Sequence, residues 1–520
     1  MHDLVFRDVD VADGSGAARY RSDVGVEGGR IVAIGAGLAG LRIIDGRGRT
    51  LAPGFIDMHS HSDWAVATDD DHSVKLAQGC TLEVLGQDGL GYVPATDDWA
   101  SSLHDRLSAW NGPAAPPWRT VADYLAVLDE GRPVNAAYLV PHGAVRMAVM
   151  GWADRAATAT ERDAMCALVA EGLAAGAVGL SAGLTYPPGM YAAADELIAL
   201  CRVVADHNGY FCPHQRSYGA GALDAYREMI DIARISGCRL HLAHATMNFA
   251  VNSGRGGELL DLVDAATDLD ISLDSYPYLP GATSLAALLP SWSMSGGPAA
   301  CASRLVDPVQ RERVRFELDV TGTDGCHGVP VEWDRIEISG VTLDRHRHLV
   351  GRSVADAAGG GRPSDFYLDL LLAEDFAPTC LMHVGHEDNV RAIMRHDRHT
   401  VGTDGLLYGD RPHPRAWGTF PRYLGRYTRE LGLFTVEECV ARMTSRPARV
   451  LGLTDRGRVD VGYAADLVLF DPAIVADTAT FAEPRRTPIG IDVVVVNGAV
   501  AIDEGRRTEA LAGRAMRRPT

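Results

Sequence analysis

The sequence predicts an α/β protein built on a closed (β/α)₈ barrel, with a small β-sandwich domain formed by both termini and a lid inserted after barrel strand seven. Through the middle of the chain, eight short apolar runs bounded by turn residues alternate with helical patterns. Buried runs separated by helices are typical of a parallel sheet. At both ends of the chain, short strand patterns are broken by glycines, which predicts that the two ends share one small domain.

The N-terminal part of the small domain is expected at residues 1–52 and its C-terminal part at residues 456–520. Strand-like segments such as LVFRDVDV near the start and GIDVVVVNGAV near the end support this division. Chain termini often lie close together in folded domains. The barrel is therefore expected between these two parts, at residues 53–455.

The eight barrel strands are predicted in PGFIDMH (53–59), CTLEVLG (80–86), AAYLVPHG (136–143), AVGLSAG (177–183), GYFCPH (209–214), RLHLAH (239–244), DISLDSYPY (270–278) and HTVGTD (399–404). The segment between the last two strands is far longer than the others. Its part at about residues 280–378 is too long for a plain loop and is expected to form the lid. TCLMHVG (379–385) is expected to be an extra strand.

The composition limits the class of partner. The formal net charge of −19 argues against nucleic-acid binding through a basic surface. No apolar run is long enough to span a bilayer, and no export signal is recognised at the start. The nine cysteines never form a CxxC pair, so neither a disulfide framework nor a zinc knuckle is expected. We expect a cytoplasmic protein that acts on a small molecule, and the sequence does not predict its oligomeric state.

Six ligand-type residues follow the predicted strands at their carboxyl ends, where barrel enzymes place their chemistry. A lone histidine at a strand end is more often a structural core residue, but the coincidence of six such residues at one end favours a metal site. Imidazole and carboxylate ligands suit one or two Zn²⁺ ions, and Mn²⁺ or another divalent ion is also possible. A metal-bound hydroxide is the expected nucleophile, with Asp404 carrying its proton to a leaving amine. The six predicted ligands are His59, His61, Asp88, His214, His244 and Asp404.

Longer motifs carry a resemblance to a known family. PGFIDMHSH, GLSAGLTYPPGMYA (179–192), DSYPYLPGATS (274–284) and RPHPRAWGTFPRY (411–423) resemble the amidohydrolase superfamily and, within it, the D-aminoacylase or N-acyl-D-amino-acid deacylase family. The resemblance covers residues from about 50 to 480. It implies metal-dependent hydrolysis of the amide bond of an N-acyl-D-amino acid or a closely related amide. It also implies that Arg415 binds the substrate carboxylate and that Tyr278 and Ser284 contact the substrate.

This chain departs from the family pattern in three places. Related sequences carry GNCG where this chain has GQDG, so Asp88 replaces a cysteine ligand by a carboxylate that can bridge two ions. Thr246 stands where the family has a lysine for the substrate carboxylate. The motif HQRSYG lacks the acidic residue that follows the arginine in related sequences. Its arginine, Arg216, either supplies the missing positive charge or is a structural arginine paired with a neighbouring carboxylate.

Lys75 is the only lysine of the chain. It precedes the second predicted strand, which is the wrong position for the carbamylated lysine that bridges two metals elsewhere in the superfamily. Asp88 is therefore the better candidate bridge.

Three alternatives remain at this point. A hydantoinase-like or dihydroorotase-like hydrolase of cyclic amides or ureides would use the same metal site; the position of Lys75 argues against it, and Thr246 argues for it. An aminohydrolase acting on a base would need a carboxylate that HQRSYG does not offer. A binding protein on an inherited barrel is disfavoured because all the ligand positions are filled.

Overall fold

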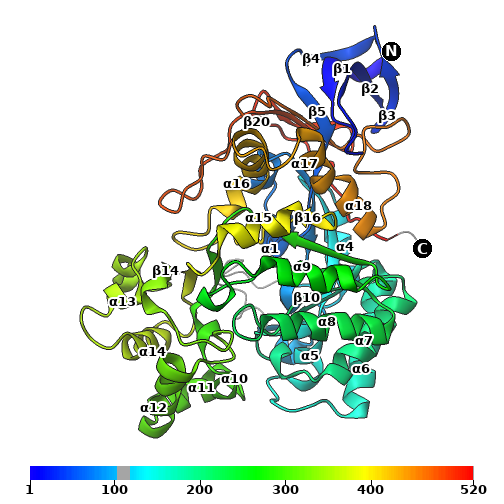
Figure 1. Cartoon of the computed structure of the whole chain (residues 1–520). Coiled ribbons are helices and arrows are strands. Elements are labelled where there is room, and N and C mark those ends of the chain that lie inside the picture. The colour runs from blue at the N-terminus through cyan, green and yellow to red at the C-terminus, as the bar shows by residue number, and fades with distance from the viewer. Residues whose placement is uncertain (102–116, 519–520) are drawn as a thin grey trace.

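The structure is a computed structural model, which describes residues 1–101 and 117–518. It consists of a central barrel, a small β-domain from both ends of the chain and an inserted lid (Figure 1). The small domain lies at the top of the view and the lid at the lower left. No helix in the described part of the chain is long and apolar enough to cross a membrane.

The eight predicted barrel strands are all confirmed, and they form one parallel sheet in chain order. Backbone hydrogen bonds bring the first and last strands together: Met58 N–H donates to the Val401 carbonyl at 3.1 Å, and Asp404 N–H donates to the His59 carbonyl at 2.8 Å. The sheet is thereby a nearly closed barrel. Its strands are β6 (Phe55–Asp57), β7 (Cys80–Leu85), β8 (Asn135–Pro141), β9 (Gly179–Gly183), β10 (Tyr210–His214), β11 (Arg239–Leu242), β12 (Ile271–Ser275) and β16 (His399–Val401).

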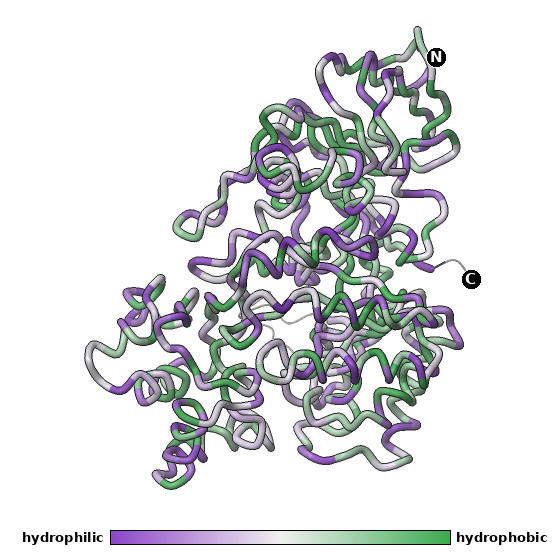
Figure 2. Tube along the Cα trace, viewed as in Figure 1, coloured by the Kyte–Doolittle hydropathy of each residue, from purple (hydrophilic) through white to green (hydrophobic). Residues whose placement is uncertain are grey.

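Helices cover the outside of the barrel, and hydrophilic and hydrophobic residues alternate along them (Figure 2). Each buries one face, as the 3.6-residue period requires. In the longest, Thr158 and Glu161 form a capping box at the start, and Gly176 ends the helix with φ of 119°. The helices around the barrel are α1 (Asp63–Thr68), α2 (Ser73–Leu76), α4 (Val121–Asp129), α5 (His142–Met150), α6 (Ala159–Ala175), α7 (Ala194–Asp206), α8 (Ala222–Ser236), α9 (Gly256–Ala265), α15 (Glu387–Arg395), α16 (Arg415–Arg422), α17 (Val436–Met443) and α18 (Ser445–Leu451).

The small domain is one continuous sheet that both ends of the chain build. A register shift between Phe6 and Val9 bends β1, so that its first half pairs with β4 and its second half with β5. β5 then pairs with β17, which joins the N-terminal strands to the C-terminal ones. The strands are β1 (His2–Val11), β2 (Tyr20–Glu27), β3 (Arg30–Gly35), β4 (Gly40–Asp45), β5 (Thr50–Pro53), β17 (Leu467–Phe470), β18 (Ile491–Val496), β19 (Ala499–Asp503) and β20 (Arg506–Arg507).

The lid has a hydrophobic core of its own, which includes Leu305, Trp333 and Tyr367. The predicted extra strand is confirmed as β15 (Thr379–Met382), which pairs antiparallel with two other lid strands. The remaining elements are β13 (Gly281–Ser284), β14 (Ile336–Gly340), α10 (Ser291–Met294), α11 (Pro298–Val306), α12 (Pro308–Phe316), α13 (Val354–Ala357) and α14 (Pro363–Ala373).

The only lysine of the chain is fully buried between the first two barrel strands and the loop after β16. Lys75 Nζ lies 2.6 Å from Asp57 Oδ2 and 3.0 Å from Glu83 Oε1, and it donates to Thr403 Oγ1 at 2.9 Å. Burial opposes ionisation of Glu83, but Lys75 lowers the pKa of this carboxyl below its usual range. Lys75 is the ammonium group that both carboxylates share, and Glu83 has a second basic neighbour in His72, whose Nε2 lies 2.5 Å from Glu83 Oε2.

We predict that Lys75→Met lowers the free energy of unfolding by about 3–5 kcal/mol, because it removes the ammonium group that the buried carboxylates of Asp57 and Glu83 share. The midpoint of urea unfolding measures the loss. Arg47→Met is the matched control, since its partner Asp45 lies in an exposed ion pair whose removal should leave the midpoint unchanged. Equal midpoints for the two variants would refute the role given to Lys75.

Candidate metal centre

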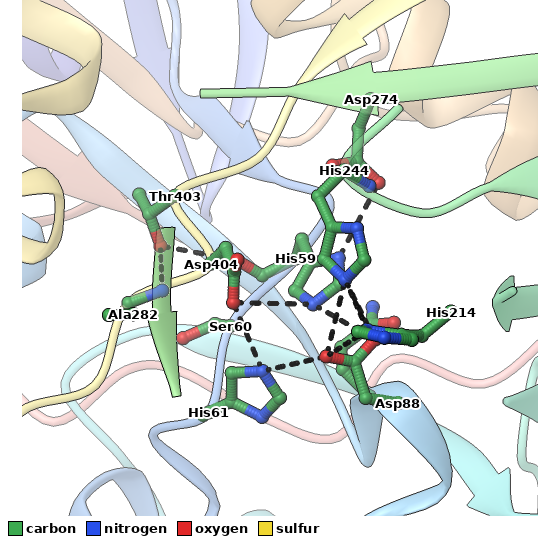
Figure 3. Close-up of polar contacts among 12 residues, drawn as sticks. His59, Ser60, His61, Asp88, His214, His244, Asp274, Ala282, Thr403 and Asp404 are labelled. Carbon is green, nitrogen blue, oxygen red and sulfur yellow. Dashed lines mark hydrogen bonds and ion pairs between the residues drawn. The ribbon is translucent and has the colours of Figure 1, made fainter. Parts of the chain in front are cut away.

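All six predicted ligand side chains lie in one buried cluster at the carboxyl end of the barrel strands (Figure 3). The Asp88 carboxylate is at its middle. One of its oxygens lies 3.5 Å from His59 Nε2 and 3.3 Å from His244 Nε2. The other lies 3.4 Å from His61 Nε2 and 3.6 Å from His214 Nδ1. Four imidazoles from three different strand ends thus face one carboxylate.

The donor atoms form two overlapping groups that could each hold a metal ion. Within each group the ligand atoms lie within 4.8 Å of one another, and Asp88 belongs to both. His59 Nε2 and Asp88 Oδ1 are fully buried and have no hydrogen-bond partner among the described residues. Buried polar atoms are rarely left in this state, so the cluster fits one or two divalent cations. The groups are His59, His61, Asp88 and Asp404, and Asp88, His214 and His244.

The backbone that presents Asp88 requires a close approach between two strand ends. Asp88 has φ of 55°, in the left-handed region, and Gly86, two residues before it, lies in the same region with φ of 71°. A Cβ atom on Gly183, at the end of β9, would come 1.9 Å from the Asp88 carbonyl oxygen. Glycine at this position therefore allows the loop after β7 to lie against β9, in the conformation that places the Asp88 carboxylate against the four histidines.

A residue that the sequence reasoning missed supports the cluster from behind. Asp274 is fully buried at the end of β12, where one oxygen accepts a hydrogen bond from the backbone N–H of His244 at 3.0 Å and the other lies 3.6 Å from the His59 ring at Nδ1. A carboxylate behind an imidazole fixes the ring's orientation. Asp274 shows the same pattern as the predicted ligands, a polar residue at the carboxyl end of a barrel strand, so the sequence did carry a signal for it.

The hydroxyl groups of Tyr218 and Thr185 contact the outer ring nitrogens of two cluster histidines. The Tyr218 hydroxyl lies 3.0 Å from His244 Nδ1, and Thr185 Oγ1 lies 2.7 Å from His214 Nε2. These contacts leave His244 Nε2 and His214 Nδ1 facing the cluster. Sequence alone gave no signal for either partner, because both lie in irregular loops.

Charge in the cluster is balanced by short-range contacts. Burial alone would raise the pKa of Asp88, but the facing imidazoles hold the pKa of this carboxyl well below its usual range. Burial opposes ionisation of Asp404 too, and Arg415, whose Nη2 lies 2.9 Å from Asp404 Oδ2, lowers its pKa. Both carboxylates are therefore negatively charged at neutral pH.

Arg415 also borders a cavity beside the cluster. Its side chain is buried and lies over the Tyr276 ring, with its guanidinium carbon 4.4 Å from the ring centre. Its Nε and Nη1 have no hydrogen-bond partner among the described residues. A buried guanidinium with two unbonded nitrogens is suited to an anionic ligand such as a carboxylate.

Tyr278 and Ser284, the other expected substrate contacts, are not among the described residues that line this cavity. The Tyr278 hydroxyl donates to Asp477 at 3.3 Å, and the Ser284 hydroxyl caps a short helical turn by accepting from Ala286 N–H. Their neighbours Tyr276 and Thr283 line the cavity instead. Thr246, at the position of the family lysine, also lines it.

Arg216 is a structural arginine rather than a second cation of the cavity. Its Nε donates to both oxygens of Glu228, at 3.0 and 2.9 Å, and its terminal nitrogens donate to the carbonyls of Met190 and Ala192. Of the two interpretations that the sequence left open, the structure favours pairing with a neighbouring carboxylate.

Comparisons with known proteins agree with this arrangement. The model of the amidohydrolase family matches residues 42–502. A D-aminoacylase of Alcaligenes xylosoxydans xylosoxydans is 35% identical, with 99% of this chain and 98% of the relative covered. An N-acyl-D-glutamate deacylase of the same organism is 34% identical, with 99% and 96% covered. The solved structure of an N-acyl-D-glutamate deacylase from Bordetella bronchiseptica, complexed with zinc and a phosphonate mimic of the tetrahedral intermediate, matches with a TM-score of 0.84 and 34% identity over 99% of both chains.

We predict that Asp88→Asn binds fewer metal ions per chain than either His61→Asn or His214→Asn, because Asp88 alone belongs to both ligand groups. Elemental analysis of the metal-loaded, desalted proteins measures the content. Circular dichroism of the same samples is the control for folding. Full metal content in folded Asp88→Asn would contradict the shared position.

Proposed function

Because this chain belongs to the amidohydrolase family, we propose that it hydrolyses the amide bond of N-acyl-D-amino acids in a metal-dependent reaction. The observation that carries the proposal is the position of Arg415, a guanidinium with two unbonded nitrogens in a side chain that borders the cavity next to Asp404 and the histidine cluster. A carboxylate held there would leave the neighbouring acylamino group beside the cluster. The D configuration is supported by the names of the relatives.

We assign the metal to the two ligand groups that share Asp88, as one or two ions of Zn²⁺ or Mn²⁺. A bound divalent cation lowers the pKa of water to give a nucleophile and polarises the amide carbonyl. The mixed imidazole and carboxylate donor set suits both metals. Zinc is further supported by the complex of the related Bordetella enzyme.

We assign the proton transfers to Asp404. It is ionised because Arg415 lowers its pKa, and its Oδ1 lies 3.2 Å from His61 Nε2 at the edge of the cluster. It accepts a proton from the attacking water as the water oxygen bonds to the carbonyl carbon. When the C–N bond breaks, the same proton passes to the departing nitrogen, which leaves as an amine.

We predict amine release from N-acetyl-D-amino acids and not from their L enantiomers, and loss of this activity after removal of metal by a chelator. The assay compares D and L pairs of N-acetylmethionine before chelation, after it, and after addition of Zn²⁺ or Mn²⁺. Release from the L series alone, or undiminished release from metal-free protein, would overturn the proposal.

We predict that Asp404→Asn loses turnover while keeping its fold, because an amide cannot accept the proton. Single-turnover measurements of amine release test this directly, with the melting temperature as the control for folding. Turnover within ten-fold of the wild type would remove Asp404 from the proton path.

We predict that Arg415→Gln weakens the preference for a substrate carboxylate by about 1.5–3 kcal/mol, the usual contribution of a charged hydrogen bond. The measurement is the ratio of kcat/KM for N-acetyl-D-methionine to that for N-acetyl-3-(methylthio)propylamine, the same molecule without the carboxylate. Arg216→Gln is the matched control and should leave the ratio unchanged, because Arg216 is bound to Glu228. A ratio unaffected in Arg415→Gln would exclude Arg415 as the carboxylate ligand.

A further inference from the structure

The cavity beside the cluster contains one permanent cation among the described residues that line it, and this is Arg415. One of its terminal nitrogens is already bound to Asp404. Arg216, the other arginine considered for the site, is bound to Glu228. The cavity therefore offers enough positive charge for one carboxylate of a ligand.

The lid side of the cavity is mostly apolar. Leu288, Met382 and Val384 come from the lid, and Phe249 from the loop after β11 lies with them. A second carboxylate placed against these side chains would lose its water without gaining a cationic partner. Such a loss is costly because ionised groups are strongly hydrated.

The one titratable lid residue on the cavity is His327, and it is neutral. Its Nδ1 accepts a hydrogen bond from the Tyr218 N–H at 3.4 Å, so the ring proton is on Nε2. Burial, with His214 and His244 nearby, lowers the pKa of His327 to about 3. His327 can donate a hydrogen bond to a ligand, but it does not supply a charge.

The remaining polar lining next to it is also uncharged. Thr246 Oγ1 donates to Asn248 Oδ1 at 2.8 Å, and both side chains are only partly buried. The two carboxylates at the cavity, Asp88 and Asp404, belong to the proposed metal ligands, and they add no cationic side chain for a second carboxylate.

Resting on the proposed function, we infer that this enzyme selects N-acyl-D-amino acids with uncharged side chains and discriminates against those with acidic ones. The two kinds of named relatives do not decide this point, since a D-aminoacylase and an N-acyl-D-glutamate deacylase match at 35% and 34% identity. The charge of the cavity does decide it. Arg415 binds the carboxylate common to all such substrates, and the described lining residues offer no second cationic side chain.

The test is a matched pair, N-acetyl-D-glutamine and N-acetyl-D-glutamate, which have nearly the same shape and differ in one charge. We expect kcat/KM to favour glutamine by about ten- to a hundred-fold, the effect of one unpaired charged group. Equal rates, or preference for glutamate, would overturn the inference while leaving the deacylase function in place. Release from neither compound, nor from N-acetyl-D-methionine, would overturn both.

A cation added to the cavity should change the preference. In Asn248→Lys we expect the glutamine-to-glutamate ratio of kcat/KM to fall at least ten-fold, and in Asn248→Met, a control of similar length without charge, we expect it to stay within three-fold of the wild type. The melting temperature of each variant reports its folding, and the wild-type ratio decides the inference even if a variant does not fold. An unchanged ratio in folded Asn248→Lys would contradict the electrostatic explanation.

Discussion

The structure depends on the burial of two carboxylates among four imidazoles at one end of the barrel. Asp88 lies 3.3–3.6 Å from nitrogens of all four rings, and Asp404 is held by Arg415. Isolated charges of this kind would be expelled from a protein interior or neutralised there. The cluster is stable because its carboxylates face imidazoles and a guanidinium. Its donor set is also suited to a divalent cation. The barrel provides the geometry, since only strand ends from opposite sides of a closed sheet can converge in this way.

A second layer of buried polar groups fixes the first. Lys75 contacts Thr403, whose neighbour in the chain is Asp404, and Ser60, which stands between His59 and His61. Asp274 contacts two of the histidines from the opposite side. These contacts tie the ligand-bearing loops to the barrel core. A loss of charge balance among these groups would therefore disturb the geometry of the site and also lower the stability of the fold.

The sequence predicted the strands and the six clustered side chains because both follow from local pattern. An apolar run that ends in a polar ligand marks a strand end, and parallel strands place such ends together. The predictions for Tyr278 and Ser284 did not lead to the cavity. The chain leaves regular strand geometry after Ser275, so neither alternation nor motif position indicates which neighbouring side chain turns inward. The pairing of Arg216 with Glu228 was left open, since it depends on how the loop after β10 packs against helix α8, which carries Glu228.

Chemistry and selectivity come from different parts of the chain. The cluster is built from barrel strand ends, whereas the surface opposite it comes largely from the lid, through Leu288, His327 and Met382. A lid with its own hydrophobic core can change its cavity-facing side chains without disturbing the barrel. Sequence identity over the whole chain therefore indicates the reaction, but it does not indicate which substrate side chain is accepted. For this chain, the selection among substrate side chains follows from the side chains of the cavity. Arg415, paired with Asp404, is the one permanent cation among the described lining residues, and the lid contributes an apolar wall.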